Sequence, residues 1–292
     1  MDRKTISGFL IAVAFLLASC SAKQKPIIVG SKQLTEQVIL GEIIAQHLEH
    51  RLKDPIRRSL NINGTLLTHQ GLQSGEIDLY PEYTGTAFMN VLKHNSINDP
   101  AIVLERVKSE YAALQMDWLD PLGFNNTFAM VVRGQDARER HLETLSDAAA
   151  DRKGFVLGCG PEFLDRPDGY QVLNSGYSIK WNASAKTMDL GLLYRALEQR
   201  QVDMAAGSAT DGLLSKLDLK VLKDDKSVFP PYQACIVVRQ EAEKAHPGLK
   251  EALLELSGKI SPDEMQKMNY AVDGEHKQPA RVAAGFLKGK GL

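Results

Sequence analysis

The chain has 292 residues, with 35 Lys and Arg against 36 Asp and Glu, so its formal net charge is −1. There is no basic excess of the kind that nucleic-acid-binding proteins use to attract phosphates. With 43% hydrophobic and 24% charged residues the composition is that of a globular protein, and the length suits two domains of about 100 to 150 residues each.

The N-terminus carries a targeting signal. Arg3 and Lys4 precede an apolar run from Phe9 to Ala18, which is too short to span a bilayer and fits the hydrophobic region of a secretory signal. The run ends in "LASC", which resembles the lipobox of bacterial lipoproteins, where the Cys is diacylated and begins the mature chain. We therefore expect a signal peptide over residues 1–19, a lipid anchor on Cys20 and a polar tether over 20–26. An ordinary signal peptide with an incidental Cys is the alternative.

Strand and helix patterns alternate after the tether. A β-branched strand at 27–30 leads into a helical pattern from residue 34, with Thr35 as its expected N-cap and Lys32 in the turn between. Further strands are expected at 59–63, 77–83, 128–132, 155–160, 202–208 and 234–238. Ser146 is the expected N-cap of a short helix, and the tail is helical, with Ser261 as an N-cap before Pro262.

Two segments with one pattern predict two lobes. Residues 120–132 ("DPLGFNNTFAMVV") and 226–238 ("KSVFPPYQACIVV") each combine a Pro-punctuated polar stretch, an aromatic residue and an apolar β-branched run. Segments of this kind are expected where the chain leaves one domain and returns to it. We expect lobe 1 to hold residues 27–123 and 230–292, and lobe 2 to hold 124–229.

Motifs of enzymes and metal sites are missing from the sequence. There is no phosphate loop, no H-E-x-x-H, no C-x-x-C and no G-x-S-x-G, so we predict neither catalysis, nor a cofactor, nor a metal. His47 and His50 have a metal-ligand spacing on a helix, but no third ligand is close in the sequence. Cys159 and Cys235 are interpreted as buried strand thiols, with a disulfide as the alternative.

Aromatic and polar residues gather instead at predicted strand ends and loops. In "DLYPEYTGT", residues 78–86, we expect Tyr80 to end a strand and pack, and Tyr83 to stand in the following loop. The carboxyl ends of strands face the crevice in such α/β folds, where aromatic faces attract quaternary ammonium groups and cationic or hydroxyl groups bind carboxylates. Each ring alone also fits ordinary core packing. The candidate ligand-binding residues are Lys32, Tyr83, Thr86, Asn126, Phe128, Arg166, Ser208 and Tyr232.

Long stretches of residues 27–288 resemble one family. "GSKQLTEQVILGEIIAQ", "GTLLTHQGLQSGEIDLYPEYTGTA", "GPEFLDRPDGY" and "DDKSVFPPYQACIVVRQE" are similar to substrate-binding proteins of osmoprotectant ABC importers of the glycine betaine/choline class. The resemblance implies a type II periplasmic-binding fold, in which two α/β lobes joined by two crossover strands close on a ligand. It also implies a monomer outside the cytoplasm that delivers its ligand to an ABC permease and its ATPase.

The resemblance also assigns roles to residues. Tyr83, Phe128 and Tyr232 would form an aromatic cage for the cation, and Lys32, Arg166 and Thr86 would bind a carboxylate. The family commonly has Tyr at the position of Phe128, and often an aromatic residue where this chain has Ser208. Losing one wall of the cage would cost on the order of 1 kcal/mol. The ligand is therefore expected to be a small quaternary-ammonium compound, and a different polar solute, such as an amino acid derivative, is the alternative.

Overall fold

The computed structural model describes residues 25–292. The expected signal peptide, Cys20 and the first part of the tether lie outside the described residues. Within residues 25–292, no helix combines the length and the apolar character needed to cross a membrane.

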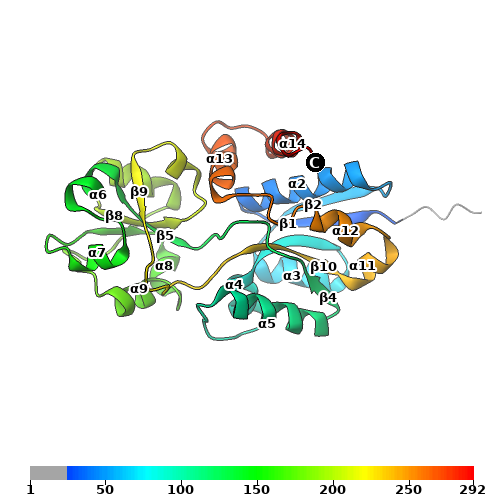
Figure 1. The fold of residues 1–292 in the computed structure, drawn as a ribbon, viewed down its shortest axis with the longest axis horizontal. Coiled ribbons are helices and arrows are strands. Elements are labelled where there is room, and N and C mark those ends of the chain that lie inside the picture. The colour runs from blue at the N-terminus through cyan, green and yellow to red at the C-terminus, as the bar shows by residue number, and fades with distance from the viewer. Residues whose placement is uncertain (1–24) are drawn as a thin grey trace, which may run out of the picture.

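The described chain forms two α/β parts, each built around one five-stranded sheet (Figure 1). The first part contains the first sheet, and the second part contains the second sheet. The first sheet has the order β2-β1-β3-β10-β4, and the second has the order β7-β6-β8-β5-β9. In each, the first three strands are parallel and the fourth, which arrives from a distant part of the chain, is antiparallel to both of its neighbours. The two sheets therefore share one topology.

The strands of the first sheet are β1 (Ile27–Lys32), β2 (Ile56–Ile62), β3 (Leu79–Tyr83), β4 (Met116–Trp118) and β10 (Ala234–Arg239). Those of the second are β5 (Phe128–Arg133), β6 (Leu157–Cys159), β7 (Lys186–Thr187), β8 (Met204–Ser208) and β9 (Leu219–Leu222). The helices of the first part are α2 (Thr35–Arg51), α3 (Thr65–Ser74), α4 (Thr84–Thr86), η1 (Ala87–Val91) and α5 (Pro100–Ala113). Those around the second sheet are α6 (Gly134–Arg140), α7 (Leu145–Ala150), α8 (Pro161–Asp165), α9 (Tyr170–Tyr177), η2 (Leu190–Leu192), α10 (Leu193–Glu198) and η3 (Gly212–Ser215). The tail forms α11 (Gln240–Ala245), α12 (Leu249–Leu254), α13 (Pro262–Asp273) and α14 (Pro279–Lys290).

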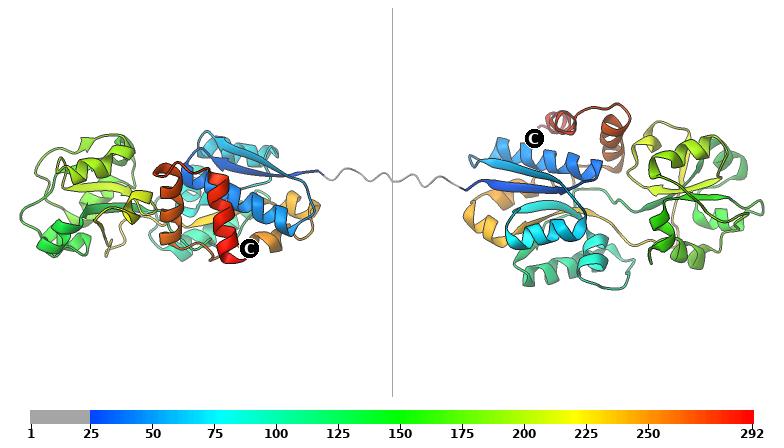
Figure 2. Two further views of the ribbon diagram at one scale, coloured as in Figure 1. Left: turned by 90° about the horizontal axis from the view of Figure 1, so that it is seen from above. Right: turned by 180° about the vertical axis from the view of Figure 1, so that it is seen from behind.

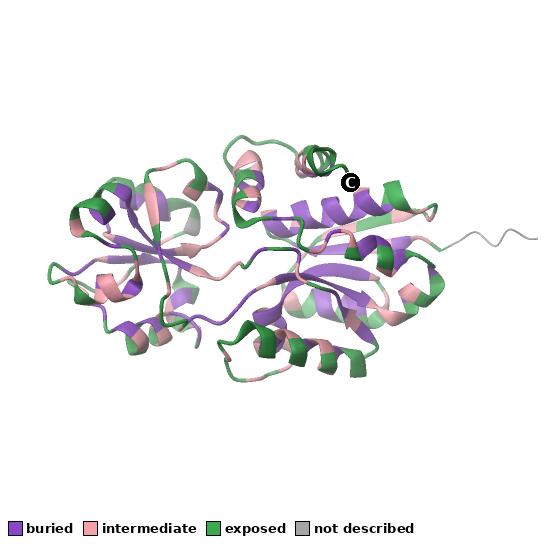
Figure 3. Cartoon of the chain, in the orientation of Figure 1, coloured by how far each residue is buried: buried purple, intermediate pink, exposed green. Residues whose placement is uncertain are grey.

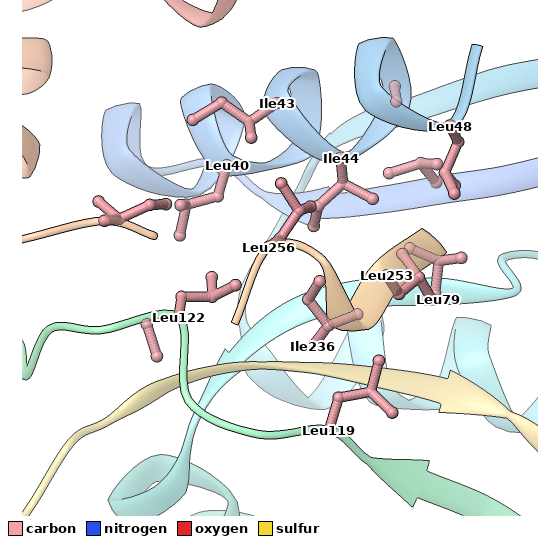
Figure 4. Packing of buried hydrophobic residues seen from close by; sticks show 14 of the residues in the cluster. Leu40, Ile43, Ile44, Leu48, Leu79, Leu119, Leu122, Ile236, Leu253 and Leu256 are labelled. Carbon is pink, nitrogen blue, oxygen red and sulfur yellow. The ribbon is translucent and has the colours of Figure 1, made fainter. Parts of the chain in front are cut away.

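The core of the first part lies between α2 and its sheet (Figure 4). Leu40, Ile43, Ile44 and Leu48 recur at helical spacing on α2 and are all but inaccessible to solvent. In Figure 4, Leu40, Ile44 and Leu48 lie on the side of α2 that faces the sheet. Figure 3 shows the same division over residues 25–292, with buried central strands and helices that are exposed on their outer sides. This packing places the N-terminus of α2 close to the end of β1.

The two crossover segments run side by side between the sheets (Figure 1). Asn125 and Gln233 form an isolated antiparallel bridge, and the Asn126 amide donates to the Tyr232 carbonyl at 3.0 Å. The tail adds a third connection. Gln266 and Asn269 of α13 donate to the carbonyls of Ala209 and Thr210, just after β8, at 2.9 and 2.8 Å. Figure 2 shows α13 beside the second part, with α14 along α2. The lobe boundaries at 123/124 and 229/230 stay a prediction.

Several local expectations need correction. Thr35 is the first helical residue of α2 and not its N-cap, and its hydroxyl donates to Asp273 at 2.7 Å. Thr144 and not Ser146 caps α7, because Thr144 and Asp147 form a reciprocal capping box, whereas Ser146 bonds Asp225. The predicted Ser261 cap with Pro262 in the first turn is confirmed.

The two cysteines of the described residues are free and buried. Cys159 lies in β6 and Cys235 in β10, in different sheets, which agrees with strand-borne thiols rather than a disulfide.

Candidate functional site

Tyr80 and Tyr83 occupy opposite faces of one strand. Both belong to β3, so Tyr83 ends a strand rather than standing in a loop, and it is only 5% exposed. Residues three apart on a strand point to opposite sides. Tyr80 packs in the cluster that contains Tyr111 and Trp118, as predicted, whereas Tyr83 packs on the α2 side of the sheet.

Lys32 lies beside the Tyr83 ring but is already ion-paired. It is the buried last residue of β1 rather than part of a turn. Its Nζ is 2.5 Å from Glu82 Oε1 and 5.0 Å from the centroid of the Tyr83 ring. Glu82 is fully buried and also accepts a hydrogen bond from the Tyr83 amide at 2.8 Å. A ligand carboxylate at Lys32 would therefore share the ammonium with Glu82.

A buried carboxylate, Glu36, links Tyr83 to the second part of the molecule. The Tyr83 hydroxyl donates to Glu36 Oε1 at 2.5 Å, and Asn126 Nδ2 donates to the same oxygen at 3.0 Å. Ser208 Oγ in turn donates to Asn126 Oδ1 and lies 3.2 Å from the Thr210 hydroxyl. We call Glu36, Tyr83, Asn126 and Ser208 the Glu36 network. It brings together three of the predicted site residues.

Arg166 and Tyr232 form a second group around Asp168. The Arg166 guanidinium donates to both oxygens of Asp168, at 2.9 and 2.6 Å, and to the Tyr232 hydroxyl at 2.9 Å. Its Cζ lies 5.2 Å from the centroid of the Phe128 ring and 5.9 Å from that of Tyr232, within cation–π range. Phe163 and Phe229 pack edgewise or tilted on Phe128, at 5.0 and 5.6 Å. We call Phe128, Arg166, Asp168 and Tyr232 the Arg166 network.

Burial and charge set the protonation of both networks. Burial raises the pKa of Glu36, against the opposing hydrogen bonds from its neighbours, and burial followed by the charge of Glu36 raises the pKa of Tyr83. Burial also raises the pKa of Asp168, but the hydrogen bonds from Arg166 and Tyr232 outweigh it, so the net pKa is lowered. The Asp168 hydrogen bond raises the pKa of Arg166. Arg166 and Asp168 are thus a charged pair.

Thr86 is the last residue of α4 and stands apart from both networks. It is half-buried, and within the described part of the chain its hydroxyl has no hydrogen-bond partner. The preceding Gly85 touches the Tyr232 ring, because a Cβ built there would be 2.9 Å from two ring carbons. Residues 83–86 therefore contribute Tyr83 to the Glu36 network and contact the Arg166 network through Gly85.

Glu36, Glu82 and Asp168 were missed by the sequence reasoning. Glu36 lies in "KQLTEQ", where an acid is typical of the start of a helix, and Asp168 lies in "DRPDGY", where an acid is typical of a turn. Their signal is indirect: each acid is within six residues of a predicted basic or aromatic site residue. No helical or strand period reveals that such an acid is buried.

Among residues 25–292 there is no group of three His, Cys, Asp or Glu side chains that could hold a metal ion. His47 is fully buried, and its Nε2 lies 2.9 Å from the Ala252 carbonyl. This contact gives His47 a packing role in the core.

The arrangement of two α/β sheets, two crossovers and an aromatic, ion-paired junction can be compared with known proteins. Residues 25–289 match the family model described as the substrate binding domain of ABC-type glycine betaine transport systems. The chain belongs to this family. The fold predicted from the sequence is confirmed, and family and named relatives are transport proteins rather than enzymes.

Three relatives illustrate the range of the family. The carnitine transport binding protein OpuCC of Listeria monocytogenes is 35% identical, over 99% of this chain and 97% of that protein. The ergothioneine transport permease/ergothioneine binding protein EgtU of Helicobacter pylori is 38% identical over 99% of this chain, which spans only 53% of that protein. A crystal structure described as a glycine betaine/carnitine/choline ABC transporter has a TM-score of 0.85 and 35% identity, over 90% of this chain and 98% of its own.

Proposed function

We propose that this family member captures a small quaternary-ammonium compound between its two lobes and delivers it to an ABC permease and its ATPase. One observation carries the proposal: aromatic rings from three segments, Tyr83, Phe128 and Tyr232, gather at the junction of the two sheets beside two ion pairs. Each desolvated ring face attracts a quaternary ammonium by about 0.5 to 2 kcal/mol. Tyr83 ends a strand of the first sheet and Phe128 begins one of the second, so closing the lobes would bring both to one ligand.

Arg166, Lys32 and Thr86 are proposed to bind the carboxylate of a zwitterionic ligand. Arg166 and Lys32 would do so while paired with Asp168 and Glu82, and the unpartnered hydroxyl of Thr86 is free to donate. Asn126 is proposed to orient the junction, because it bonds both Glu36 and Ser208. The protein would act outside the cytoplasm as a monomer, held to the membrane by a lipid on Cys20. Membrane fractionation of wild type and Cys20→Ser tests the anchor.

Isothermal titration with glycine betaine, proline betaine, carnitine and choline tests the ligand class. We expect saturable heat and a raised melting temperature with at least one of them. If none of the four produces either signal, the assignment to a small ligand of the glycine betaine/choline class is wrong.

A second candidate ligand is a bulkier amino acid derivative. Ser208 pairs directly with Phe128 across β5 and β8, so a small side chain stands next to that ring where the family often has an aromatic one. The name of the Helicobacter pylori relative, which concerns ergothioneine, a trimethylammonium derivative of an amino acid, points the same way. Mass spectrometry of ligand released from protein purified without unfolding distinguishes the two candidates. Titration with ergothioneine gives an independent test.

A further inference from the structure

Glu36 is a buried acid at the junction of the two lobes. It is 6% exposed, and its carboxylate is surrounded by donors from three separate segments. Tyr83 of β3 and Asn126 of the first crossover donate to Oε1, and Asn269 of α13 donates to Oε2 at 3.0 Å. Among the ion pairs of residues 25–292, none involves Glu36.

The hydrogen-bond donors around Glu36 favour its ionised form. The side-chain nitrogen of Asn269 also donates to the Thr210 carbonyl at 2.8 Å. Because a carbonyl can only accept, the nitrogen of this side-chain amide, and not its oxygen, lies next to Glu36. The Oδ1 of Asn126 is taken by Ser208, which leaves its nitrogen for Glu36. Hydrogen bonds from Thr210, Tyr83, Asn269 and Asn126 favour the ionised form, whereas burial opposes them and raises the pKa of Glu36 on balance. A cation bound close by would shift this balance toward the carboxylate.

The other charges near the proposed cage cancel in pairs. Lys32 is neutralised by Glu82 at 2.5 Å, and Arg166 by Asp168 at 2.6 Å. Glu36 is thus the charge that this junction leaves without a counter-ion, and a buried charge is costly unless it is paired. Hydrogen bonds compensate that cost in part.

We propose that Glu36 is the counter-charge for the ligand's quaternary ammonium group and thereby selects cations at this site; the inference rests on the proposed function. Tyr83 connects the two: its hydroxyl donates to Glu36, and its ring face is a proposed wall of the cage. Donation to a carboxylate polarises the phenol toward negative charge, which strengthens its attraction for a cation. The field of the carboxylate adds to this attraction in a water-poor junction.

Ligands of the same shape that lack the positive charge separate charge from fit. In 3,3-dimethylbutanol, which is neutral, and 3,3-dimethylbutanoate, which is an anion, a carbon replaces the nitrogen of choline and of glycine betaine. For Glu36→Gln, we expect choline or glycine betaine to bind about tenfold more weakly or worse, while the matching isostere loses less than about twofold in affinity. Competition titration gives the ratio of the two affinities, which a purely structural role of Glu36 would leave unchanged.

Tyr83→Phe separates the two contributions, because it removes the hydrogen bond between the phenol and Glu36 but keeps both the ring and the charge of Glu36. We expect the cation-to-isostere ratio to fall, but by less than in Glu36→Gln. If Glu36→Gln is poorly folded by circular dichroism, Glu36→Ala replaces it, with the same expected fall in the ratio. Binding of choline or glycine betaine with an unchanged ratio in the variant overturns the role of Glu36 alone. If the wild type binds none of the tested quaternary ammonium compounds, the proposed function itself fails.

Discussion

The hydroxyl of Tyr232 donates a hydrogen bond to the carboxylate of Asp168, and this bond joins the second crossover to the loop after α8. The same hydroxyl accepts from Arg166 at 2.9 Å, so Tyr232 bridges both members of an ion pair in which Asp168 is buried and Arg166 is partly exposed. Its ring is 5% exposed and lies within cation–π range of the guanidinium. Tyr232 thus contributes a hydroxyl to the junction and a face to the proposed cage, and the two contributions can be separated by substitution.

Tyr232→Phe is expected to lower stability more than ligand affinity. Removing the hydroxyl leaves Asp168 short of one donor, which costs about 1 to 3 kcal/mol, while the ring face remains. Tyr232→Ala removes both, and we expect it to weaken choline or glycine betaine binding by about tenfold beyond Tyr232→Phe. Urea unfolding and titration of the two variants measure the effects. Equal affinities of the Phe and Ala variants would show that the ring takes no part in binding.

Ser208→Tyr is expected to strengthen glycine betaine binding by about fivefold to tenfold, because it adds the missing wall of the cage. Ser208 is the direct cross-strand partner of Phe128, so the new ring would stand on the same face, beside Phe128. Ser208→Ala is the control, since it breaks the bond to Asn126 without adding a ring. Titration compares the three proteins. If the Tyr variant binds more weakly than the Ala variant, Ser208 makes room for a bulkier native ligand.

The sequence predicted the architecture because its signals are periodic and local. The apolar spacing along α2 and the paired Pro-rich crossovers indicate elements and their order directly. The Ser261 capping box was also predictable from four consecutive residues. By contrast, Thr35 and Ser146 were wrong as caps because their side chains bond Asp273 and Asp225, which are distant in the chain.

The candidate site was predictable in its residue types but not in its connections. The aromatic and basic residue types at predicted strand ends and loops indicated Phe128, Arg166 and Tyr232. In the fold, the rings of Phe128 and Tyr232 lie beside the Arg166 guanidinium. The acids that neutralise or bridge them could not be found in this way, because burial of Glu36 results from contacts with Asn126 and Asn269, 90 and 233 residues away. A tertiary hydrogen-bond network of this kind has no sequence period.

Gly85→Ala is expected to destabilise the protein by about 1 to 3 kcal/mol, because a new methyl group would overlap packed atoms. Its Cβ would lie 2.5 Å from the Pro231 carbonyl oxygen and 2.9 Å from the Tyr232 ring, so ligand affinity should fall as well. Gly285→Ala in α14 is the matched control, because nothing lies within 4 Å of its Cβ. There a helical Ala should stabilise by about 0.5 to 1 kcal/mol. Urea unfolding of both variants decides, and a Gly85→Ala protein as stable as wild type contradicts the contact.

His47 should make stability fall as the pH is lowered. Burial lowers its pKa below the usual 6.5, against the partial opposition of the Ala252 carbonyl and Glu255. Its Nε2 must donate to that carbonyl, and its Nδ1 is buried without a partner, so a second proton would have no acceptor. Because the unfolded chain binds this proton more readily, the contribution is complete above about pH 6.5 and is lost as the pH falls toward the folded pKa.

The comparison with His47→Gln isolates this residue. Burial also lowers the pKa of His69, which changes stability with pH in the same direction as His47. Burial raises the pKa of Glu36, which changes stability in the opposite direction. Both groups are present in the variant and in the wild type, so their effects cancel in the comparison. The Gln side chain keeps an amide donor for the carbonyl and does not titrate. Between pH 7.5 and 5.5, urea unfolding should therefore show a shallower loss of unfolding free energy in the variant. Parallel curves for the two proteins would mean that His47 takes up its proton equally well in the folded and the unfolded chain.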